Sequence, residues 1–79
     1  MAAFSTSVFA EALSNLVGRE RATELVDAAI VEAGLQPKAD YNAAEFASIA
    51  AALNAHGGPI AMVVSAVYAR TLATRLNAR

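Results

Sequence analysis

The chain has no cysteine, no tryptophan and only two prolines, and aromatic residues make up just 6 % of its 79 positions. Without cysteine there is neither a disulfide framework nor thiolate chemistry, so packing or association has to stabilise the fold. Hydrophobic residues supply 57 % of the chain, but much of that share is alanine, so the apolar side chains are mostly short. At this length we expect one small core and a single domain over residues 1–79.

A long unbroken hydrophobic run is also lacking. The longest uncharged segment, residues 46–69, is interrupted by Asn54, His56 and the Gly57-Gly58-Pro59 turn, which argues against a membrane-spanning helix. The first residues lack the basic region and long apolar stretch of a secretory signal. We therefore expect a cytoplasmic protein that does not bind membranes.

Charge of either sign is sparse, and the formal net charge is −1. This balance argues against generic binding to polyanions. The charges are nevertheless segregated along the chain. All seven acidic residues lie between Glu11 and Glu45, whereas the C-terminal end carries only arginines, namely Arg70, Arg75 and Arg79.

What the chain does contain is helical periodicity. Apolar residues between Val8 and Val17 form one stripe at helical spacing, and a second stripe runs from Ala22 to Ala33 opposite a charged face. Ser5 or Ser7 is placed to cap the first helix. Gly18, between the two stripes, is compatible with either a turn or a bend. Gly34 followed by Leu35 predicts the end of the second helix, with the apolar residue folding back on its last turn.

Two more helices are predicted in the second half of the chain. Asn42 with Glu45 three residues later has the spacing of a capping box and predicts a third helix from Ala43 to about Ala55. Pro59 suits the first turn of a fourth helix, which continues almost to the C-terminus. The fold class predicted is all-α, as a small four-helix bundle or an orthogonal four-helix array.

The first half of the fourth predicted helix is apolar on nearly every side. Such a helix has to be surrounded, and three short alanine-rich helices offer little cover. The sequence therefore predicts a subunit contact here, formed by six residues: Ile60, Met62, Val63, Val64, Val67 and Tyr68.

No catalytic, cofactor-binding or metal-binding motif is found, so we expect no enzyme activity and no cofactor. His56 is the only histidine; as a general base or phosphoacceptor it lacks a partner, and capping of the preceding helix is the favoured interpretation. The carboxylates of the second helix, Glu20, Glu24, Asp27 and Glu32, are interleaved with arginines, which is typical of a solvated face rather than a metal site.

The third and fourth predicted helices, joined by a glycine turn, invite comparison with a helix-turn-helix. A recognition helix needs polar residues near its start to read base edges, whereas this one begins with Pro59, Ile60, Ala61 and Met62. Arg70, Arg75 and Arg79 remain as weak candidates for phosphate contacts. The leading hypothesis is thus a non-enzymatic interaction or regulatory module that forms a homodimer or binds another protein; the alternative is a small nucleic-acid-associated regulator that uses these arginines.

Overall fold

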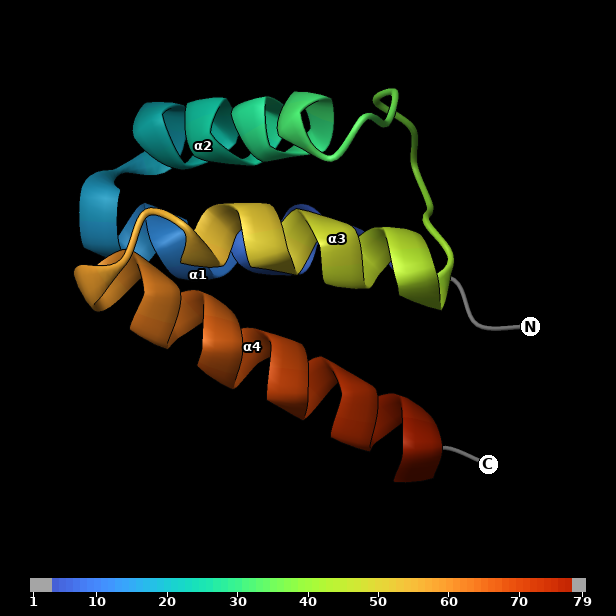
Figure 1. Ribbon diagram of the computed structural model, residues 1–79. Helices are drawn as coiled ribbons and strands as arrows, with labels where there is room; N and C mark the ends of the chain where they lie inside the picture. Colours follow the sequence, from blue (N-terminus) through green and yellow to red (C-terminus); the bar gives the residue numbers. More distant parts are fainter. Residues whose placement is uncertain (1–3, 78–79) are drawn as a thin grey trace.

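The computed structural model describes the backbone of residues 4–77 and the side chains of residues 4–74. This part of the chain contains four α-helices: α1 (Ser7–Val17), α2 (Arg19–Glu32), α3 (Ala43–Asn54) and α4 (Gly58–Asn77). They form a closed ring in which α1 and α3 each pack against both α2 and α4 (Figure 1). The predicted all-α fold of four helices is confirmed.

The last helix is inclined to the others. In Figure 1, α2 and α3 lie side by side, whereas α4 runs obliquely and its C-terminal half diverges from α3. The arrangement is therefore closer to a bundle with one tilted helix than to an orthogonal array.

Two glycines set the helix boundaries in the first half of the chain. Gly18 has a φ of +93°, so α1 ends there and α2 begins at the next residue. Gly34 has a φ of +76°, the Gly34 N–H donates to the Val31 carbonyl (2.9 Å) and the Leu35 N–H donates to the Ile30 carbonyl (3.0 Å). These two hydrogen bonds are those of a Schellman motif, and the predicted end of the second helix is confirmed.

Of the two side-chain caps that the sequence indicates, the one at the start of α3 is present. The Asn42 side chain accepts from the Glu45 N–H (2.8 Å), and the Glu45 carboxylate accepts from the Asn42 N–H (3.0 Å), which confirms the capping box at the start of α3. At the start of α1, the Ser5 hydroxyl accepts from the Ser7 N–H (3.2 Å). The N-cap residue itself is Thr6, whose side chain makes no capping hydrogen bond, so the predicted cap by Ser5 or Ser7 is wrong.

An aromatic cluster occupies the centre of the core. Phe46 of α3 is fully buried, and its ring stacks on Phe4 and Phe9 with centroids 4.7 and 4.8 Å apart. Tyr68 of α4 stacks on the same ring at 5.5 Å. Phe46 therefore joins the segment before α1, α1 itself, α3 and α4 through ring contacts.

The segment before α1 is fixed to the connector between α2 and α3. The Phe4 N–H donates to the Tyr41 carbonyl (2.9 Å), and the Tyr41 N–H donates to the Phe4 carbonyl (2.8 Å). This antiparallel bridge keeps both rings in the core, where each is only 2 % exposed. No sequence pattern predicted it.

We expect Phe46→Ala to lower the free energy of unfolding by about 3 to 5 kcal/mol, because it removes a buried ring and leaves a cavity. A loss of that size is a large part of the roughly 4 to 12 kcal/mol typical of a chain this short. Urea denaturation followed by circular dichroism would measure it. Val31→Ala is the control, because Val31 is 69 % exposed and its change should cost less than about 0.5 kcal/mol. Equal losses in the two variants would contradict the central role of Phe46.

Candidate interaction surface

The predicted contact residues on α4 divide between two faces of the helix. Val64 is fully buried in the core of its own chain, and Ile60, Val63, Val67 and Tyr68 are half-buried and pack against that core. Met62, in contrast, is 74 % exposed. Assigning Val64 to a subunit contact was therefore wrong, because α1 and α3 already cover the inner half of α4.

The outer half of α4 is uncovered within the chain. Met62 is followed on this face by Ala66, Ala69 and Ala73, all exposed and spaced by four, three and four residues. This spacing places them in one stripe along the helix. Among the described side chains of α4, Arg70 at the edge of the stripe is the only charged one.

The outer face of α2 differs sharply from this stripe. Its exposed residues are mostly charged and include Arg19, Glu20, Arg21, Glu24, Asp27 and Glu32. Charge on the side opposite the core is the usual composition of a helix that faces water. The carboxylates among them form the solvated face that the sequence predicted, and the described residues contain no group of three or more metal-binding side chains.

The uncharged surface of α4 continues onto α3. Exposed positions at the same four-three-four spacing hold Ala44, Ser48 and Ala51 of α3 and Ala55, the residue that follows it. Where the two helices adjoin, the Ser65 hydroxyl donates to the Asn54 side-chain oxygen (3.3 Å). The sequence prediction did not include α3 in this uncharged surface. The uncharged segment 46–69, which spans parts of both helices, could have indicated it.

The three arginines proposed for phosphate contacts are only partly described. Arg70 is exposed, the side chain of Arg75 lies outside the described residues, and Arg79 lies outside them altogether. Arg70 lines a hollow between α1 and α4 that Glu11 also lines. The described side chains therefore supply a single cation here, with a carboxylate nearby, and not a positive patch.

Shallow hollows occur along α1, between it and α2 and between it and α4. Their volumes of about 330 to 510 Å³ fall within the range of small-molecule sites. Such sites need a few convergent, partly buried polar groups to orient a ligand. No polar or charged residue is buried in the part of the chain that the structure describes, so these hollows lack the features of a ligand site.

His56 does not cap α3 in the way the sequence suggested. Backbone N–H groups occupy the last carbonyls: Ala55 donates to Ala51 (3.2 Å), His56 to Leu53 (3.1 Å) and Gly57 to Asn54 (3.0 Å). All three bonds come from backbone N–H groups, and the hydrogen bonds found among the described residues do not include one from the His56 ring. The side chain is exposed, and the structure does not show the predicted capping bond.

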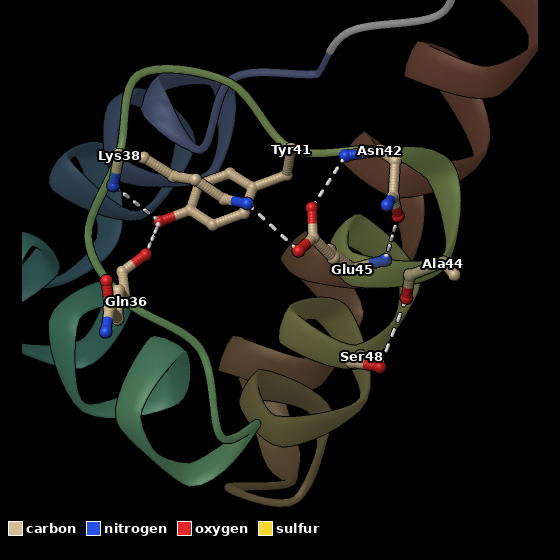
Figure 2. Close-up of polar contacts among 7 residues, drawn as sticks. All are labelled: Gln36, Lys38, Tyr41, Asn42, Ala44, Glu45 and Ser48. Carbon is tan, nitrogen blue, oxygen red and sulfur yellow. Dashed lines mark hydrogen bonds and ion pairs between the residues drawn. The ribbon is translucent and has the colours of Figure 1, made fainter.

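A network of hydrogen bonds around Tyr41 lies in the segment between α2 and α3 (Figure 2). The Tyr41 hydroxyl donates to the Gln36 carbonyl (3.0 Å) and accepts from the Lys38 N–H (3.1 Å). The Lys38 ammonium forms an ion pair with Glu45 (3.0 Å) and lies 5.3 Å from the centroid of the Tyr41 ring. Since every group has its partner within this network, we assign it a structural role: it holds the connector that carries the Phe4 bridge.

Comparison with known proteins found no match: no family model, no curated protein and no solved structure is similar to this chain. Among the described residues, no helix has both the length and the hydropathy required to cross a membrane.

The pH dependence of stability tests the connector network. The backbone N–H of Asn42, and after it Lys38, lower the pKa of Glu45 below its ordinary value of 4.5. A lowered pKa in the folded state means that ionised Glu45 stabilises the fold above about pH 4.5, and that this contribution is lost as the pH falls through the folded-state pKa. Glu45→Gln keeps the shape and removes the charge, so it should destabilise the protein at pH 7 and have a smaller effect at pH 3.

Urea denaturation at both pH values would measure these effects, with Glu24→Gln on the outer face of α2 as the control. We expect that control to change little at either pH. If Glu45→Gln lowered stability equally at pH 3 and pH 7, ionisation of Glu45 would have no part in holding the connector.

Proposed function

We propose that this protein is a non-enzymatic helical interaction module that self-associates, most simply as a two-fold dimer, through the outer face of α4. The observation that carries the proposal is the exposed stripe of Met62, Ala66, Ala69 and Ala73. A second copy would cover this stripe and shelter the half-buried edges of Ile60, Val63 and Val67 at the same time. We further propose that the module is regulatory and works in the cytoplasm.

The composition of the stripe favours close helix packing. Alanine lets two helix backbones approach each other, and each Å² of apolar surface removed from water contributes about 25 cal/mol. Burying an exposed methionine contributes about 1.5 to 3 kcal/mol, and a two-fold contact repeats that gain in both copies. The four residues of the stripe carry no charge that would have to be desolvated, so the gain has to outweigh mainly the loss of translational and rotational freedom on association.

The order of residues along the stripe suits a two-fold axis at its centre. If α4 of two copies pair in opposite directions about a point between Ala66 and Ala69, Met62 of each copy faces Ala73 of the other. A large side chain then meets a small one at both ends, and Ala66 meets Ala69 in the middle. Such alternation of size is what lets side chains interdigitate without voids.

The outer face of α3 extends the same contact. Its C-terminal end adjoins the first half of the stripe, on the side where Asn54 bonds to Ser65. The area of α4 alone is modest for a stable dimer, which usually buries at least about 1,200 Å² in total. A contact that also uses α3 comes closer to that size.

Replacing Met62 with glutamate should weaken self-association at least tenfold, because a charge would have to be buried in an apolar contact. Size-exclusion chromatography with light scattering would measure it against the monomer mass of 8.1 kDa. Val31→Glu is the matched control: Val31 is a similarly exposed apolar residue, at 69 %, but it lies on α2, and its change should leave the mass of the assembly unaltered.

A wild-type mass of 8.1 kDa over the whole micromolar range would refute self-association. Equal effects of the two variants would show that the contact does not involve the outer face of α4. If the wild type remained monomeric and another protein protected Met62 from oxidation, the stripe would be a contact for that partner instead.

A further inference from the structure

The groove between α1 and the second half of α4 adjoins the proposed dimer contact. Its walls are mixed, with Val8 on α1 and Val67 on α4 among polar side chains, and Glu11 on α1 and Arg70 on α4 also line it. Glu11 and Arg70 are both exposed, and neither takes part in the ion pair found in the described chain, which joins Lys38 to Glu45. Each copy therefore presents one acid and one base on opposite rims of this groove.

A two-fold contact between the outer faces of α4 has a consequence for Arg70. Rotation about the axis keeps each residue on its own side of the helix pair, so the Arg70 side chains of both copies lie on the same side. Arg70 is one position beyond Ala69, close to the proposed axis. Two like charges brought together at a contact oppose association unless a countercharge is present.

Glu11 is the acid placed to supply that countercharge. It lines the same groove as Arg70, and the two-fold axis sets the grooves of both copies on the same side of the dimer. We propose that a second copy of this chain occupies the rim of the α1–α4 groove, with Glu11 of each copy pairing with Arg70 of the other.

Charge complementarity is the reason for choosing a second copy as the occupant. A surface that carries one acid and one base is complementary to itself when it is repeated by a two-fold axis. A rim with a single sign of charge would instead favour a different, oppositely charged protein. Because exposed ion pairs contribute little to affinity but much to orientation, Glu11 and Arg70 would fix how the two α4 helices meet.

This inference rests on the proposed function, and charge reversal tests it separately. Glu11→Arg and Arg70→Glu should each weaken self-association by about tenfold or more, because each creates two like-charge contacts per dimer. An equimolar mixture of the two variants should associate about as well as the wild type, since both pairs in the mixed dimer are again complementary. Analytical ultracentrifugation would measure all three samples at low ionic strength, where charge effects are largest.

The mixture separates pairing between copies from pairing within one chain. If Glu11 paired with Arg70 of its own chain, only the doubly reversed variant would regain association and the mixture would not, which would overturn the inference. Circular dichroism would first establish that each variant is folded. Glu24→Arg, a charge reversal on the outer face of α2, should leave association unchanged.

Two further results would overturn the inference, and they differ in whether the proposed dimer survives. A wild-type dimer that is insensitive to either single reversal would place the α1–α4 groove outside the contact, although the dimer itself would stand. A wild-type protein that is monomeric throughout would remove the dimer and the charge pair together.

Discussion

The stacking of Phe46 against three other rings is the interaction on which the rest of the structure depends. The chain has only three phenylalanines and two tyrosines, and four of these five rings meet in one stack. The fifth, Tyr41, is joined to Phe4 by two backbone hydrogen bonds. Since most other apolar side chains are short, these rings supply much of the large buried surface that a small core needs. Placing them together fixes the relative positions of α1, α3 and α4.

The packing of this aromatic cluster also determines which side of α4 is exposed to solvent. Tyr68 stacks on Phe46, and Val64 lies fully buried on the same side of the helix. Once those residues face inward, helical geometry turns Met62, Ala66, Ala69 and Ala73 outward. The exposed stripe, and with it the proposed contact between copies, is therefore a consequence of how the core is packed.

The features that the sequence predicted correctly all depend on residues close together in the chain. The helical stripes, the capping box of Asn42 and Glu45, and the Gly34-Leu35 terminus are each determined within one or two turns, so local geometry alone produces them. Val64 and Met62 show the limit of that approach. They are two positions apart in a segment that is apolar on every side, and hydropathy alone gives no direction in which such a helix should face.

The sequence by itself determined the helical segments and most of their approximate ends, because periodicity and capping are short-range effects, but it left open whether Gly18 separates two helices or only bends one. It also determined that a long uncharged segment exists and that no disulfide can form. Only the tertiary structure decided which half of α4 is covered, how α3 extends the uncharged surface, and how Phe4 meets Tyr41. Those outcomes depend on contacts between residues far apart in the chain, and side-chain packing in three dimensions settles them.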